Sequence, residues 1–78
     1  MDMKEFIANF VDQFDEVPAT EVTPETHHHE MEEWSSMIAL SVMAMIDEEY
    51  DVKLKANEMR NSQTVQELYD IVQSHLNK

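Results

Sequence analysis

The sequence contains no cysteine and no glycine, and proline occurs only at Pro18 and Pro24. Without cysteine the chain can form no disulfide, no thiolate metal site and no cysteine nucleophile. The absence of glycine, together with the absence of strand-like alternation, favours an all-α fold. The chain has 78 residues, so we expect a single domain, residues 1–78, with one small core.

Basic residues are also scarce. Five Lys and Arg stand against 17 Asp and Glu, which gives a formal net charge of -12. Proteins that bind nucleic acids neutralise phosphates with Lys and Arg, so we expect no nucleic-acid partner. A strongly acidic surface instead favours solubility and steers the molecule toward partners with basic patches.

The chain lacks a long apolar run as well. The apolar block that starts at Met37 is too short to span a bilayer. The first residues, MDMKEF, have neither the basic region nor the apolar region of a signal peptide. We therefore expect a cytoplasmic protein that does not insert into membranes, and we expect it to be a monomer.

Apolar residues recur at helical spacing and predict a small bundle of three long helices plus one short helix. Residues 15–33 hold both prolines without any period and predict a long loop between the first two helices. The expected N-caps are Asp2, Ser35 and Thr64, with Glu67 as the capping-box partner of Thr64. The expected helices cover about residues 3–14, 36–50, 56–60 and 65–76.

Three consecutive histidines, His27, His28 and His29, lie in the expected loop. Exposed imidazoles bind transition metals, but three adjacent residues cannot all point at one ion without distortion. We expect these histidines to be solvated and expect no metal site. A metal-dependent enzyme that uses them is a further alternative, which predicts that metal is retained after chelation and purification. His75, near the end of the last helix, is expected to have no catalytic role.

The sequence favours a protein that is not an enzyme. Adjacent carboxylates at residues 32–33 and 47–49 are expected to be solvated, because acid–base catalysis needs a pocket that separates their pKa values. Ser35 and Ser36 have no glycine-rich elbow and no sheet beneath them, so a serine hydrolase is not expected. We expect no catalytic residue.

The second expected helix is unusual because residues 37–46 are apolar nearly all round. A half-exposed helix in a small protein is normally apolar on one stripe only. Such a helix can face a core on one side and a partner on another, and methionine is common on surfaces that adapt to partners. With Ser35 as the cap, Ser36 becomes the first helical residue, exposed at the positive end of the helix dipole. The side chains that the helix could offer to a partner are Met37, Leu40 and Met43.

Short motifs stand in one register, without a gap from the serine pair onward. They are Val22-Thr23-Pro24-Glu25, Trp34-Ser35-Ser36-Met37, Asp47-Glu48-Glu49-Tyr50-Asp51 and Thr64-Val65. In this pattern, and in length, charge and helix order, the whole chain resembles an acyl carrier protein. The corresponding motifs of that family read V-T-P-E, W-D-S-L, E-E-E-F-D and T-V. The register aligns Ser36, and not Ser35, with the serine that the family modifies.

The resemblance implies that a phosphopantetheinyl transferase attaches 4′-phosphopantetheine to Ser36. It also implies that the protein tethers acyl intermediates as thioesters and delivers them to acyl-transferring and acyl-modifying enzymes with basic docking patches. The expected docking residues are Met37, Leu40, Ser41, Asp47 and Glu48.

Two departures from the family pattern affect the expected role. Ser35 replaces the aspartate that precedes the modified serine, and Ile38 and Ser41 stand where many carriers have acids. We therefore expect a secondary or pathway-dedicated carrier rather than the housekeeping carrier of fatty-acid synthesis. The cargo, whether fatty acyl, aminoacyl or polyketide, stays open. The alternative is an acidic helical protein-interaction module without a prosthetic group, in which Ser35 and Ser36 are only caps.

Overall fold

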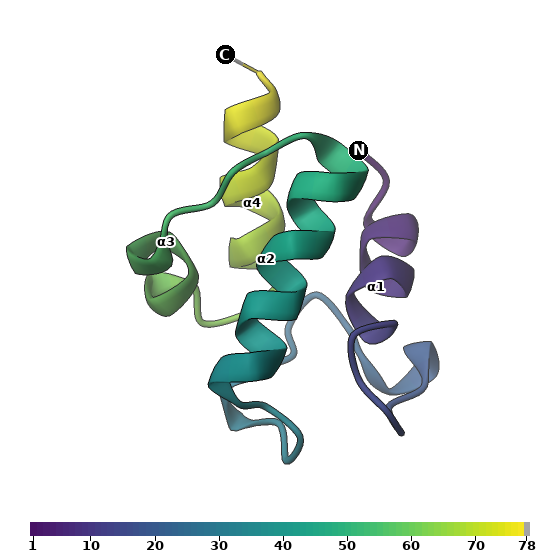
Figure 1. Ribbon diagram of the computed structural model, residues 1–78. Coiled ribbons are helices and arrows are strands. Elements are labelled where there is room, and N and C mark those ends of the chain that lie inside the picture. Colours follow the sequence, from purple (N-terminus) through teal and green to yellow (C-terminus); the bar gives the residue numbers. More distant parts are fainter. Residues whose placement is uncertain (78) are drawn as a thin grey trace.

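The computed structural model describes residues 1–77 and is all-α in these residues, as expected (Figure 1). Figure 1 shows α2 crossing the centre of the molecule, with α1 on one side and α3 on the other. No β-strand forms in the described part of the chain, where one isolated bridge pairs His27 with Thr64. The elements are α1 (Met3–Val11), η1 (Ala19–Glu21), η2 (His28–Glu30), α2 (Ser36–Tyr50), α3 (Ala56–Asn61) and α4 (Val65–Leu76), where η denotes a 3-10 helix.

The starts of α2 and α4 confirm two of the expected caps. The Ser35 hydroxyl accepts a hydrogen bond from the Ile38 N–H at 3.2 Å. The Thr64 hydroxyl accepts from the Glu67 N–H at 3.1 Å. Each bond satisfies one of the backbone donors that a helix leaves unpaired at its first turn. The Glu67 carboxylate, however, accepts from the Gln63 N–H at 2.7 Å and not from Thr64.

The expectations for α1 are partly wrong. Asp2 is the N-cap residue, but its side chain makes no capping hydrogen bond. The helix ends at Val11 and not at Phe14, because the following residues tighten into turns, with the Phe14 N–H donating to the Val11 carbonyl at 3.0 Å. The tighter turn lets the Phe14 ring pack 5.2 Å from the Phe10 ring, measured between ring centres.

The connection between α1 and α2 is ordered by long-range hydrogen bonds. The Glu33 carboxylate accepts from the Asp15 and Glu16 N–H groups at 2.9 and 3.1 Å. The Thr26 carbonyl accepts from the Val65 N–H at 3.0 Å, which fastens the connection to the start of α4. The expected loop therefore contains η1 and η2. The Glu33 carboxylate joins its two ends, and Thr26 fastens its middle to the start of α4.

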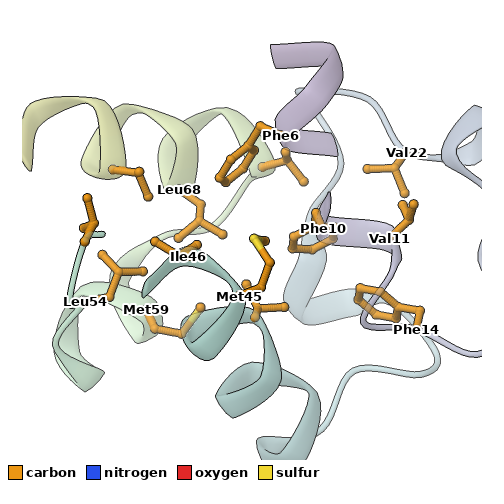
Figure 2. Close-up of a cluster of buried hydrophobic side chains, with 14 residues drawn as sticks. Phe6, Phe10, Val11, Phe14, Val22, Met45, Ile46, Leu54, Met59 and Leu68 are labelled. Carbon is orange, nitrogen blue, oxygen red and sulfur yellow. The ribbon is translucent and has the colours of Figure 1, made fainter. Parts of the chain in front are cut away.

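The core lies where α1, α2 and α4 face one another. Figure 2 shows Phe6 and Phe10 of α1 pointing toward Ile46 of α2 and Leu68 of α4. Burying each large apolar side chain of this kind stabilises a fold by about 1.5–3 kcal/mol. The apolar side chains without any exposed surface are Phe6, Phe10, Val42, Ile46, Val65, Leu68 and Val72.

The C-terminal end of α2 lies at Tyr50, as the sequence predicts. Asp51 follows it in the left-handed region, with φ 56° and ψ 40°, and its N–H donates to the Asp47 carbonyl at 2.9 Å. Glycine usually occupies such a position, but Asp tolerates it better than most residues. Within residues 1–77 no helix has both the length and the apolar character needed to cross a bilayer.

Candidate functional site

The candidate site begins at the N-terminus of α2. Ser35 is extended, with φ -155° and ψ 171°, and its hydroxyl is used on the Ile38 N–H. Ser36 is the first residue of α2 and is exposed. In an α-helix, the N–H groups at the positions of Ser36 and Met37 have no intrahelical acceptor, and the helix dipole is positive there. The Ser36 hydroxyl therefore lies in an environment that favours a phosphate.

The apolar sequence of α2 divides into two faces. Val42, Met45 and Ile46 are buried against the core. The opposite side, which we name the α2 face, consists of Met37, Leu40, Ser41 and Ala44, all exposed and spaced as neighbours on one helix surface. Met37 is 77% exposed and Leu40 is 65% exposed, although both are large and apolar.

Acidic residues near the C-terminal end of α2 extend the exposed strip that the α2 face forms. Glu48 is exposed and lies one helical turn beyond Ala44, beside an open depression between α1 and α2 that Asp12 and Ser41 also line. Asp47 is half-buried, and its carboxylate lies 3.9 Å from the Lys53 ammonium group. Four of the five expected docking residues thus share an exposed strip: Met37, Leu40, Ser41 and Glu48. The fifth, Asp47, is half-buried and paired with Lys53. Met43, the third side chain considered for docking, is half-buried against the core.

The expectation of a solvated histidine run is wrong for His28. This side chain is completely buried, with ring centres 5.0 Å from Trp34 and 6.1 Å from Phe10. Burial lowers the pKa of His28 to about 4. His29 is half-buried and only His27 is exposed. The sequence of three consecutive histidines does not indicate which of them is buried, because burial depends on residues that are far away in the sequence.

Another histidine, His75, makes a structural contact with a carboxylate. His75 Nε2 lies 2.9 Å from a Glu58 carboxylate oxygen and connects α4 to α3. The pKa of Glu58 is lowered, first by the hydrogen bond from the Lys55 N–H and then by His75. Within residues 1–77 no three His, Asp or Glu side chains gather in a way that could hold a metal ion.

Comparison of the chain with protein-family models, with curated proteins and with solved structures found no match. The site itself has a simple order along α2. An exposed serine comes first, the apolar α2 face follows, and exposed carboxylate groups come last. Any function assigned to the molecule has to account for this arrangement.

Proposed function

We propose that the protein is a carrier of the acyl carrier type, which holds acyl intermediates as thioesters on a 4′-phosphopantetheine arm attached to Ser36. The observation that carries the proposal is the position of Ser36, exposed as the first residue of α2 beside a neighbour whose hydroxyl caps the helix. The all-α architecture, with four helices in the described residues and a long connection before α2, is compatible with a carrier bundle. Its first helix, α1, has nine residues.

The residues at the start of α2 fit the phosphate of such an arm. The Ser36 hydroxyl is free for a phosphoester because Ser35 supplies the cap. The first turn of α2 contains no acidic residue, so a phosphate there meets no like charge within that turn. When bound, the group supplies a flexible thiol for the thioester. The chain supplies the attachment point, and its own residues perform no chemistry.

The strip along α2 fits the expected partners, a phosphopantetheinyl transferase and enzymes that transfer or modify acyl groups. Met37 and Leu40 offer apolar contact next to the attachment point, and Glu48 offers charge farther along. The net charge of -12 steers the molecule toward basic patches and gives fast, salt-sensitive encounters. Ser35, Ile38 and Ser41 in place of acids favour a dedicated pathway over the housekeeping one. We propose that the carrier works as a cytoplasmic monomer.

A second candidate is an acidic interaction module without a prosthetic group. The observation in its favour is that Ser35 already caps α2 and that Met37 and Leu40 form a docking surface without any modification. On this reading, Ser36 is an exposed helix residue with no further role. The two candidates differ in one measurable property, which is whether a transferase loads the protein.

The decisive experiment incubates the protein with coenzyme A and broad-specificity phosphopantetheinyl transferases. We expect the wild type to gain the mass of one arm and to react with a thiol reagent, and Ser36→Ala to do neither. Because the chain has no cysteine, any free thiol belongs to the arm. Ser36→Ala should stay folded by circular dichroism, since alanine suits a helix and the Ser35 cap is untouched.

Ser74→Ala is the matched control, because Ser74 is also an exposed serine within a helix but lies on α4 and is not among the expected docking residues. We expect Ser74→Ala to load like the wild type. A thiol on folded Ser36→Ala would show that another serine carries the arm. No loading of the wild type by any transferase would favour the interaction module.

A further inference from the structure

The buried His28 lies at the junction of several elements. Its ring centre is 6.1 Å from Phe10 of α1, 4.5 Å from His29 of η2 and 5.0 Å from Trp34. No part of the side chain is exposed. An imidazole that is wholly surrounded in this way can be accommodated when it is neutral, whereas its charged form loses the solvation that water provides.

The hydrogen bonds around His28 determine which nitrogen carries the proton. Ser62 is also buried, and its hydroxyl donates to the Met59 carbonyl at 2.8 Å. A hydroxyl has a single hydrogen, so the Ser62 oxygen must act as the acceptor toward His28 Nε2, 3.3 Å away. Neutral His28 therefore holds its proton on Nε2. Its other nitrogen, Nδ1, is buried and has no hydrogen-bond partner within residues 1–77.

These bonds connect η2 to α3. His28 reaches Ser62, the C-cap of α3, and through it the Met59 carbonyl. The neighbouring His29 Nε2 also lies within hydrogen-bond distance of the Met59 carbonyl, at 3.3 Å. A short 3-10 helix with few residues has little stability of its own, so η2 depends on such contacts. Since η2 shortly precedes Ser35, the contacts hold the segment that leads into α2.

A second proton on His28 would break this arrangement. The new Nδ1–H would have no acceptor, and the charge would sit among apolar rings. The charged groups that face it are His29 and His27 from its own segment, which repel it when protonated, and Glu67 of α4, which attracts it. The side chains that α1 and α3 contribute, Phe10 and Ser62, carry no charge.

We propose that His28 is an acid-sensitive latch between η2 and α3, which opens when Nδ1 takes up a proton and the side chain moves out to water. The latch belongs to the unmodified chain, so it does not depend on the proposed function of Ser36. Protonation of His28 would therefore release the segment that precedes α2.

The direction in which stability changes with pH follows from the pKa values of His28 in the unfolded and in the folded chain. Burial lowers the pKa of His28 from 6.5 to about 4 in the folded chain. Between these values the unfolded or opened form binds one proton more than the closed form, so stability falls as the pH falls. Within this window, each pH unit raises the unfolding equilibrium constant about tenfold through this one group.

The acidic surface acts in the opposite direction. The chain has 17 Asp and Glu residues, and protonating them at low pH relieves their mutual repulsion. The pH profile of the wild type is therefore a sum of two effects of opposite sign. A variant that lacks only the buried imidazole separates them, because it retains every carboxylate.

The test compares the urea unfolding of the wild type, His28→Phe and His27→Gln at pH 7 and pH 4.5. Unfolding is monitored by circular dichroism and by the fluorescence of Trp34, the single tryptophan. Phenylalanine fills a similar volume and cannot take up a proton. We expect the unfolding constant to rise between the two pH values by on the order of 50-fold more in the wild type than in His28→Phe. His27→Gln, which alters the exposed histidine, should follow the wild type.

An identical pH dependence in the wild type and His28→Phe would overturn the latch. If His28→Phe does not fold, the titration of the His28 ring in the wild type by nuclear magnetic resonance decides the question alone. A midpoint near 4, accompanied by changes in the signals of η2 and α3, supports the latch. The same midpoint without any change in those signals contradicts it. A midpoint near the ordinary value for histidine, in a chain that stays folded, excludes it.

Discussion

Two polar residues lie in the interior of the described part of this small fold. His28 and Ser62 are the buried polar residues of the described core, and they are bonded to each other. A buried polar group stabilises a fold only when it is paired, and removing one partner leaves the other with its full desolvation penalty. The pair therefore makes the core sensitive to substitutions that would be harmless at the surface.

Ser62→Ala tests this sensitivity. The substitution removes the hydroxyl that accepts from the His28 Nε2–H and that donates to the Met59 carbonyl. We expect it to lower the free energy of unfolding by about 1–3 kcal/mol at pH 7, measured by urea denaturation.

Ser74→Ala is the matched control for that experiment. Ser74 donates to the Ile71 carbonyl at 2.8 Å, a bond of the same kind and spacing, but on an exposed residue. We expect a change within about 0.5 kcal/mol, as for most surface substitutions. Equal losses for the two variants would show that burial of the His28–Ser62 pair has no energetic consequence.

At the scale of elements, α2 has to serve the core and the surface at once. Its buried side chains, such as Ile46, pack in the core that α1 and α4 also face (Figure 2). Leu40, on the α2 face, is exposed. Large apolar side chains that remain exposed contribute little to folding, because they are not removed from water. The division of α2 into two faces therefore predicts two separate consequences of shortening its apolar side chains.

Leu40→Ala and Ile46→Ala measure how much each face of α2 contributes to the free energy of unfolding. Both remove an apolar side chain of similar size from the same helix, but Leu40 is 65% exposed and Ile46 is fully buried. We expect a loss of about 2–5 kcal/mol in unfolding free energy for Ile46→Ala and less than about 0.5 kcal/mol for Leu40→Ala. If Leu40→Ala is as destabilising as Ile46→Ala, the α2 face is not a free surface.

On the scale of the whole molecule, charge is the dominant property. Of the 17 acidic residues, three have a basic partner within ion-pair distance in the described residues, and two of those partners are histidines. Many carboxylates on a small fold repel one another, and dissolved ions screen this repulsion. The compact state should therefore be strained at low ionic strength.

We expect the melting temperature at pH 7 to rise when sodium chloride is increased from dilute buffer to about 0.2 M, and to rise further with magnesium. Glu49→Gln removes one exposed carboxylate near Asp47 and Glu48, so it should raise the melting temperature in dilute buffer and less so at high salt. A melting temperature that is independent of salt in both proteins would show that the surface charge does not strain the fold.

The parts of the structure that follow from the sequence alone are those decided by neighbouring residues. The boundaries of α2 and the start of α4 were predictable, because a hydroxyl at Ser35 or Thr64 bonds to an N–H three residues away and the apolar period follows directly. The exposed place of Ser36 follows from the same local rule. Its modification remains a prediction, which depends on the family resemblance.

What the tertiary structure decided involves residues that are far apart in the sequence. His28 is buried because Ser62, 34 residues later, provides its acceptor and because Phe10 and Trp34 surround it. No local pattern marks it out from His27 and His29. The division of α2 into a buried face and an exposed face has the same origin. Helical spacing shows which side chains share a surface, but only packing against the other helices determines which surface is covered.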